Sequence, residues 1–514
     1  MQPEFNDSTQ PMRWYWLVLV GAGVLAGAIL RLVWLDDMEW KLDEQWTYDR
    51  VRFAEVEPTA WLGMPTSYQL RHPPGTVWVF QALGWLVGAR SPVDLAWATA
   101  ALNALAILGV VVFARCCLVP AQREAWYWAA ALAAVNPVGV LLQRKIWPPS
   151  VLPAFVLLLL VGWQTRRHRL GALFWGAMGP LLGQVHPVGL FVAAGLAGWA
   201  WLFDRRGVRW GYWAVGSAMA LIPLVPWLEY AWVEMAQSPI SQRSWVNTLT
   251  PKFWLRCLTE PFGFDSYYAL GRDFRLLLAG PTVGGLASGG LGAVHGLLLV
   301  GCVGWWCCLG RAVLVQRRPL HWTNPTRPTE FTLGAGLVGF AVVFALAGLP
   351  MHRHYMLAIF PLAQVGLAHT LLKWTRHGRC WLALLLLAQL AVCVGCLHFI
   401  HTAHRPIAGE YGTPYSVQSH QAVQSQQSVQ PKQSEHPVLR SERSVQPVQS
   451  VQPVQSVQAV GTLRLRGARG GRDGGQQIGH ARQAAGGRDH GSSPVEPLAP
   501  VGGCAEVVQH RRLN

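Results

Sequence analysis

The sequence contains few charged residues. Only 13% of its 514 residues are Asp, Glu, Lys or Arg, whereas a soluble domain carries about 25%. The deficit is spread over several apolar runs, each close to the roughly 20 residues that cross a hydrocarbon core. The composition therefore predicts a polytopic membrane protein. The first run, residues 14–35, is too long for the core of a signal peptide, so we expect a retained membrane anchor.

Several motifs of soluble enzymes are also missing. The sequence has no HExxH, no Walker loop and no nucleophile elbow, so nothing favours ATP-driven transport or serine hydrolysis. The ten cysteines form no disulfide framework, because most lie in or beside apolar runs. Cys393 and Cys396 have redox spacing, but they lack the βαβ context of a thioredoxin and are interpreted as packing residues.

The net charge of +16 does not predict a nucleic-acid partner. The basic residues are scattered over short loops between apolar runs, where membrane topology explains them. The positive-inside rule places the loops richest in Arg and Lys in the cytoplasm, together with the N-terminus (1–13). Membrane lipids are the expected surroundings, and the bacterial inner membrane is the expected location.

These patterns predict an all-α bundle of about eleven spans within residues 14–400. After the first span, the expected crossings are 92–114, 124–142, 149–165, 169–185, 187–203, 210–228, 286–311, 332–350, 353–373 and 379–400. Two long outer loops, 36–91 and 229–285, and an outer segment at 401–415 follow from this topology. Residues 76–90 are too short for an ordinary crossing and predict an interfacial or re-entrant helix. The repetitive tail, 416–514, has a composition typical of disorder.

An acidic cluster lies in the first outer loop, in the stretch "WKLDEQW" (40–46). Asp43 and Glu44 are flanked by Trp40 and Trp46, and Trp prefers the membrane–water boundary. Partial desolvation at that depth raises the pKa of a carboxylate and makes it a better base. A general base or a divalent-metal ligand is the functional interpretation. A fully hydrated loop is the alternative.

Cationic and titratable residues recur on the same predicted face. They lie in "YQLRHPPGT" (Arg71, His72), "LLQRKIWPPSV" (Arg144, Lys145), "GQVHPVG" (His186) and "MHRHYML" (Arg353). A cation beside a helix N-terminus suits a phosphate or a carboxylate. Arg144 and Lys145 break the charge rule, so either lipid phosphate or the first-loop acids must compensate them. The alternatives are loop or helix-end arginines and lysines that snorkel, and a structural, hydrogen-bonded histidine.

The order of these motifs resembles the GT-C superfamily of integral-membrane glycosyltransferases. It is most similar to bacterial members of the dolichyl-phosphate-mannose–protein mannosyltransferase and aminoarabinose transferase group. "WKLDEQW", "RHPPGTVWVF", "RKIWPPSVLP", "GQVHPVG", "HRHYMLAIFPLA" and "GEYGTPY" (409–415) carry the resemblance, which covers about residues 10–415.

The resemblance implies sugar transfer from a polyprenyl-phosphate donor to a lipid, glycan or protein acceptor on the non-cytoplasmic face, with inversion. It implies that Asp43 is the general base and that Glu44 assists it or binds a metal ion such as Mg²⁺ or Mn²⁺. It implies that the phosphate is bound by residues from the set Arg71, His72, Arg144, Lys145, His186 and Arg353. The chain departs from relatives at Trp147, Pro148 and Pro149, where many carry an acid. That departure puts metal dependence and the identity of the sugar in doubt.

Two other functions remain open from the sequence. A transporter or lipid flippase predicts titratable groups deep in several spans and discontinuous helices in corresponding halves. A non-catalytic membrane scaffold gives no reason for acids and cations to converge on one face. The clustering of polar residues at the outer side favours the enzyme.

Overall fold

The protein is described by a computed structural model, which covers residues 12–56, 58–66, 70–237, 251–283, 286–315 and 321–429. Most of the predicted cytoplasmic N-terminus, and residues 430–514 of the tail, lie outside the described residues. All described residues belong to one compact unit, Met1–Ser434.

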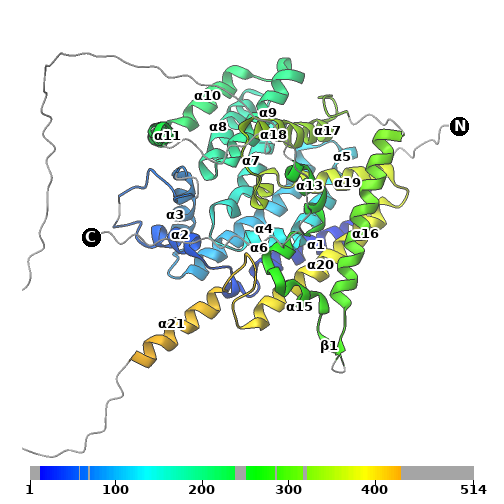
Figure 1. Cartoon of the computed structure of the whole chain (residues 1–514). Coiled ribbons are helices and arrows are strands. Elements are labelled where there is room, and N and C mark those ends of the chain that lie inside the picture. Colours follow the sequence, from blue (N-terminus) through cyan, green and yellow to red (C-terminus); the bar gives the residue numbers. More distant parts are fainter. Residues whose placement is uncertain are drawn as a thin grey trace, which may run out of the picture. The chain divides into compact units, whose positions relative to one another are not determined.

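The described chain is almost entirely helical (Figure 1). In chain order its α-helices are α1 (Trp14–Leu32), α2 (Leu42–Arg52), α3 (Gly75–Val87), α4 (Pro92–Cys117), α5 (Pro120–Val135), α6 (Pro137–Gln143), α7 (Leu152–Gln164), α8 (Arg169–Val185), α9 (Val188–Phe203), α10 (Trp210–Leu221), α11 (Val225–Gln237), α13 (Pro251–Thr259), α14 (Ser266–Leu270), α15 (Phe274–Ala279), α16 (Gly290–Gly310), α17 (Pro328–Leu333), α18 (Phe340–Ala347), α19 (Leu362–Trp374), α20 (Gly378–Ala403) and α21 (Tyr415–Val429).

Shorter elements join these helices. They are η1 (Leu35–Asp37), η2 (Pro148–Val151), η3 (Arg205–Gly207), η4 (Ile222–Leu224), η5 (Glu260–Phe262), η6 (Gly271–Asp273), η7 (Arg311–Val315), η8 (Gly334–Gly339) and η9 (Arg353–Ile359). Strands β1 (Thr282–Val283) and β2 (Leu286–Ala287) pair antiparallel as a small hairpin. The hairpin explains why α16 begins at Gly290, later than the predicted crossing 286–311.

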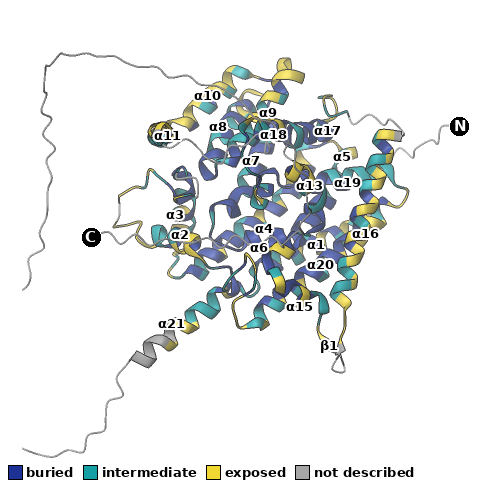
Figure 2. Cartoon of the chain, in the orientation of Figure 1, coloured by how far each residue is buried: buried dark blue, intermediate teal, exposed yellow. Residues whose placement is uncertain are grey.

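The predicted fold class is confirmed as an all-α, polytopic architecture. Within the described residues, six helices are long and apolar enough to cross a membrane, and up to eight if each of two bent pairs counts as one span, which is fewer than the eleven predicted. The remaining predicted crossings are also helical, but α7, α8 and α9 are shorter than a full span. Helix α3 falls where the sequence predicts an interfacial helix. In Figure 2 exposed residues follow α10 and α16, and their large exposed side chains include Val300 and Met219, as expected for a lipid-facing surface.

Helix α5 forms the centre of the core. Its residues 125–135 are all buried except the half-buried Tyr127, and they are mostly alanine. Small side chains allow neighbouring helices to approach closely. Gly27 of α1 packs directly on Ala134, so closely that a Cβ at Gly27 would lie 2.4 Å from the Ala134 carbonyl oxygen. Helices α1, α4, α19 and α20 all pack around α5.

The predicted crossing 124–142 is broken between α5 and α6, which meet at 65°. Pro137 causes the break, because it has no N–H to donate to the carbonyl of Ala133. The buried guanidinium of Arg31 supplies substitute donors: its Nη2 lies 3.2 Å from Ala133 O and its Nη1 lies 2.5 Å from Ala134 O. The same side chain donates from Nε to Gln143 Oε1 at 2.8 Å. Arg31 therefore holds the broken helix in place. A second break separates η9 from α19, at 70°.

Two side-chain contacts of α20 identify the two ends of the bundle. Helix α20 begins beside α5, where Arg379 Nε lies 2.7 Å from Glu124 Oε1. It ends beside the first loop, where His401 Nδ1 lies 2.7 Å from Asp37 Oδ2. The predicted outer loop 36–91 therefore lies at the far end of α20 from the predicted cytoplasmic residues at 115–124.

Helix α21 occupies the start of the segment that the sequence predicts to be disordered. In the structure residues 416–429 of that segment are helical, and side chains of the first turn contact the first loop. Ser416 Oγ donates to Asp37 Oδ1 at 2.6 Å, and Gln418 Nε2 donates to the carbonyl of Trp40 at 2.8 Å.

Candidate functional site

Asp43 and Glu44 lie in the first turn of α2, where the helix begins. The backbone N–H of Lys41 donates to Glu44 Oε2 at 3.0 Å and fixes this turn. Adjacent residues on a helix point about 100° apart. Consequently Glu44 is fully buried, whereas Asp43 is exposed. Among the described residues, the Asp43 side chain has no ion-pair partner.

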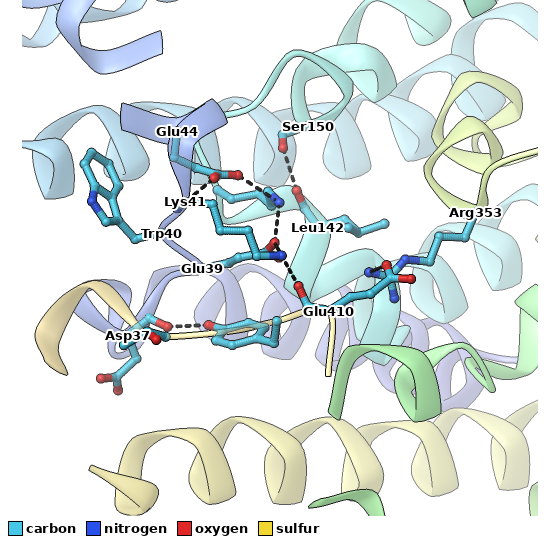
Figure 3. Close-up of polar contacts among 12 residues, drawn as sticks. Asp37, Glu39, Trp40, Lys41, Glu44, Leu142, Ser150, Arg353 and Glu410 are labelled. Carbon is cyan, nitrogen blue, oxygen red and sulfur yellow. Dashed lines mark hydrogen bonds and ion pairs between the residues drawn. The ribbon is translucent and has the colours of Figure 1, made fainter. Parts of the chain in front are cut away.

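A buried ion network lies beneath this turn (Figure 3). Lys145 Nζ lies 2.8 Å from Glu44 Oε1 and 3.0 Å from Glu39 Oε1. Lys41 Nζ, at the edge of the network, lies 2.6 Å from the same Glu39 oxygen. Two carboxylates thus share two ammonium groups, which lets the charges remain inside the protein. The sequence prediction left open whether lipid phosphate or first-loop acids compensate Lys145, and the structure shows that the acids do.

The pKa values of the network follow from burial and pairing. Burial raises the pKa of Glu44 and outweighs the attraction of Lys145. Burial would also raise the pKa of Glu39, but Lys145 and Lys41 lower it overall. Burial would lower the pKa of Lys145, yet the two carboxylates raise it. Glu39 and Lys145 are therefore a stable charged pair, and Glu44 is the member that protonates most readily.

Arg144 is also satisfied inside the protein. Its Nη2 donates to the carbonyls of Val33 and Trp34, at 2.6 and 2.5 Å, just after α1 ends. Its relative exposure is 2%, and that of Lys145 is 4%. The structure gives both predicted phosphate ligands internal partners. A role at the donor phosphate remains a prediction for them.

The "GEYGTPY" segment packs against the first loop, although about 370 residues separate the two. The buried Tyr411 hydroxyl donates to the carbonyl of Asp37. The backbone N–H of Tyr415 donates to Met38 O at 3.0 Å, and Glu39 forms a backbone bridge with Pro414. The two sequence motifs thus build one wall of the site.

Histidines form a second cluster near the same network. The rings of His72 and His186 are 5.1 Å apart between centroids, and those of His186 and His354 are 5.7 Å apart. Trp147 connects this histidine cluster to the ion network: its ring lies 4.7 Å from His354, and Lys145 Nζ lies 4.2 Å above it. Four of the predicted motifs therefore meet at one end of the bundle.

The two predicted histidines in this cluster are uncharged at neutral pH. Burial lowers the pKa of His72 to about 4. Burial, together with His72 and His352, lowers the pKa of His186 well below its usual range. The backbone N–H of Val188 donates to His186 Nδ1 at 3.2 Å, so the proton of neutral His186 is on Nε2. His186 is therefore a neutral hydrogen-bond donor rather than a cation.

The predicted arginines lie at the edges of the cluster. Arg71, which precedes α3, donates from Nε to Gly63 O at 3.1 Å. Arg353 opens η9 with a side chain that is 13% exposed, and its Nη2 forms an ion pair with Glu410 Oε2. Figure 3 shows this pair beside the ion network of Glu39 and Glu44.

A small polar cavity of about 30 Å³ lies between Arg353 and the break after α5. It is lined by Asn136, Gln143 and Glu260 among others, and its size suits one or two water molecules. Glu260 Oε2 is buried without a hydrogen-bond partner in the described chain. Burial, and next Asp265, raises the pKa of Glu260 well above its usual range. The cavity thus holds a carboxyl group that tends to be protonated.

Glu39, Glu260 and Glu410 are not among the site residues that the sequence predicts. Glu39 directly precedes "WKLDEQW" and Glu410 lies within "GEYGTPY", so their proximity to these motifs is the signal that could identify them. Glu260 lies in the second outer loop, where nothing in the local sequence marks it.

The residues present do not fit the divalent ion considered for Asp43 and Glu44. Glu44 is bound to Lys145 and points inward, whereas Asp43 points outward. The described residues contain no group of three or more His, Cys, Asp or Glu arranged to hold a metal ion. Metal dependence remains a prediction from the acidic cluster in the sequence and from the resemblance.

No family model and no curated protein matches the sequence. Among solved structures, the chain is similar to apo Archaeoglobus fulgidus oligosaccharyltransferase, with 15% identity and a TM-score of 0.40 over 82% of this chain and 59% of that one. It is also similar to ArnT from Cupriavidus metallidurans in the apo state, with 14% identity and a TM-score of 0.44 over 79% and 84% of the two chains. The same ArnT bound to undecaprenyl phosphate gives 13% identity and a TM-score of 0.38 over 79% and 85%. The chain thus spans less than two thirds of the oligosaccharyltransferase.

TM-scores below 0.5 at such low identity establish no activity for this chain, so its function has to be argued from the site itself.

Proposed function

We propose that this protein is a membrane glycosyltransferase that moves a sugar from a polyprenyl phosphate to an acceptor on the non-cytoplasmic face. The observation that carries the proposal is that an exposed carboxylate, Asp43, lies at the same end of the bundle as a set of side chains that the motif resemblance assigns to the phosphate. The set is Arg71, His72, His186 and Arg353. The buried network under α2 fixes the helix, so that Asp43 is held in position but remains accessible.

In the proposed reaction Asp43 accepts the proton of the acceptor hydroxyl. The hydroxyl oxygen forms a bond with the anomeric carbon of the sugar while the bond from that carbon to the phosphate oxygen breaks. The polyprenyl phosphate departs with the bonding electrons, and the configuration inverts because the displacement is single. Preorganised donors around the phosphate stabilise the charge that develops there. Arg353 supplies a full charge, and neutral His186 supplies an N–H.

The second outer loop offers a surface for the acceptor. Tyr267 and Tyr268 are about half exposed, and Trp254 is 38% exposed. Aromatic faces of this kind pack against the apolar faces of sugars. Mannose and aminoarabinose are the first sugars to test, because the motif resemblance points to transferases of those two kinds.

The transporter or flippase alternative has one observation in its favour. The bent pairs α5–α6 and η9–α19 are discontinuous helices of the kind that transporters use at substrate sites. The alternative also predicts charged residues deep in the spans. Arg31 is such a residue, but it supports transport only weakly, because its guanidinium donates to the groups at the α5–α6 break.

One experiment tests the proposal. Purified protein in liposomes is given undecaprenyl-phosphate-linked mannose or aminoarabinose, and free undecaprenyl phosphate is measured. Asp43→Asn should lower the rate by about 10²- to 10⁴-fold, the contribution of a general base. Asp49→Asn, on the same helix, is the matched control and should keep the wild-type rate. Full activity of Asp43→Asn would remove Asp43 as the base, and movement of intact donor across the bilayer without turnover would favour the flippase.

A further inference from the structure

The ion pair between Arg353 and Glu410 occupies the place where the proposed donor phosphate would bind. The two partners differ in exposure. The Arg353 side chain is 13% exposed and lines the internal cavity, whereas that of Glu410 is 61% exposed. Arg353 is therefore the fixed member, and Glu410 is the member that can leave by rotating into water.

The backbone of Glu410 is held on both sides. Its N–H donates to Tyr268 O at 3.0 Å, and its carbonyl accepts from Lys41 Nζ. The next residue, Tyr411, donates from its N–H to Ala269 O at 2.9 Å. The Glu410 carboxylate can thus leave Arg353 without any change in the wall that "GEYGTPY" builds.

Arg353 has few other negative partners. Asp265, the nearby acid of the second loop, forms an ion pair with Arg256. Glu260 shares the cavity with Arg353 but is buried and tends to be neutral. Without Glu410, Arg353 would be a largely buried cation with little compensation, which is unfavourable. A carboxylate and a phosphate bind the planar guanidinium in the same way, and the phosphate carries more charge.

We propose that Glu410 is the resting counterion of Arg353 and that the phosphate of a polyprenyl phosphate displaces it on binding. This inference rests on the proposed function, because it assigns the donor phosphate to Arg353. Glu410 then sets the affinity of the site: it keeps the arginine paired while the site is empty, and it competes with the phosphate.

The test is binding of undecaprenyl phosphate to the full-length protein in detergent, with undecaprenol as the ligand that lacks phosphate. Glu410→Gln should bind undecaprenyl phosphate about two- to five-fold more tightly, the range expected when an exposed ion pair is removed as a competitor. Glu410→Ala should shift affinity in the same direction. Asp36→Asn, which neutralises an exposed first-loop acid, is the matched control and should bind like wild type. Undecaprenol binding should not change in any variant.

Each outcome has a distinct meaning. Unchanged or weaker binding of undecaprenyl phosphate by Glu410→Gln, with wild-type thermal stability, overturns the counterion role. Wild-type binding by Arg353→Gln places the phosphate elsewhere and overturns the inference, but it leaves the proposed function standing. If the wild-type protein does not distinguish undecaprenyl phosphate from undecaprenol, the proposed donor and the inference both fail.

Discussion

Replacement of Lys145 by methionine tests the buried ion network most directly. The variant keeps the length of the side chain but removes the ammonium group that Glu39 and Glu44 share, at 3.0 and 2.8 Å. Glu39 keeps Lys41 as a partner, whereas Glu44 loses its only ion-pair partner among the described residues. Because Glu44 is fully buried, we expect it to become protonated rather than remain as an unpaired charge.

The expected loss of stability follows from that proton. A glutamate with a reference pKa of about 4.3 costs about 3.7 kcal/mol to protonate at pH 7, at about 1.36 kcal/mol per pKa unit. This value lies within the 3–5 kcal/mol typical of breaking a buried ion pair. At pH 5 the same step costs only about 1 kcal/mol. The penalty of Lys145→Met should therefore shrink by between about 2 and 3 kcal/mol from pH 7 to pH 5.

The sign is opposite for Glu39. In the native network Glu39 has a lowered pKa, so its contribution to stability is present above its unfolded pKa and is lost as the pH falls through its folded pKa. The Glu39 contribution is therefore lost only below about pH 4.5, whereas protonation relieves the isolated Glu44 of the variant already between pH 7 and pH 5. Glu44 also has a raised pKa in wild type, so wild type shares part of this relief. Lowering the pH from 7 to 5 should bring the two proteins closer in stability.

The assay is denaturant unfolding in detergent micelles, followed by the fluorescence of the 27 tryptophans. Lys41→Met is the matched control: it removes an ammonium group from the same network, but from one that is 43% exposed, and it should cost no more than about 1 kcal/mol. The double variant Lys145→Met, Glu44→Gln should recover part of the loss. A Lys145→Met penalty below about 1 kcal/mol at pH 7, or one that does not change with pH, would refute the account of the network.

Three further predictions concern other parts of the molecule. Arg31→Met should lower the free energy of unfolding by roughly 3–5 kcal/mol, because it leaves buried carbonyls without donors. The exposed control Arg13→Met should change the free energy of unfolding little, and an equal loss in both variants would contradict the bridging role of Arg31. The pKa of His72 is lowered to about 4, so stability falls as the pH drops from about 6.5 toward 4. His72→Gln should flatten this part of the pH–stability curve, and an unchanged curve would contradict the burial of the neutral ring. For the topology, the exposed native cysteines are first replaced, and a single cysteine is then introduced at Asp36 or at Arg205. The two introduced cysteines should react with an impermeant maleimide from opposite sides of the membrane. Labelling of both from the same side would overturn the topology.

Local patterns in the sequence predict the helices well. The long apolar runs give the spans, the pair of prolines before α3 marks where that helix begins, and the scarcity of charge sets the fold class. The breaks are harder to predict. The run 124–142 is apolar apart from Glu124 and Asn136. Pro137 alone does not reveal that Arg31, more than 100 residues earlier, stabilises a 65° bend there.

The sequence indicates which motifs form the candidate site, but it does not indicate which charged residues form ion pairs with each other. Arg144 and Lys145 are adjacent in the chain, and the resemblance implies phosphate binding for both. In the structure Arg144 caps the end of α1 through two carbonyls, whereas Lys145 joins two carboxylates of the first loop. These partners lie about 100 residues away, and only the packing of α1 and α6 brings them within reach.

The angle between adjacent side chains on α2 has a further consequence for the site. Glu44 points inward to reach Lys145, and Asp43, about 100° away around the helix, points outward. A shift of the helix by one residue would turn Asp43 toward Lys145 in place of Glu44. The buried network therefore fixes which of the two adjacent acids faces outward, where the proposed acceptor would bind. A variant that loosens the network, such as Glu44→Gln, should lower turnover without removing the base itself, so its activity should lie between that of wild type and that of Asp43→Asn. Equal activity of Glu44→Gln and wild type would mean that α2 keeps its register without the ion pair, and that Lys145 serves stability alone.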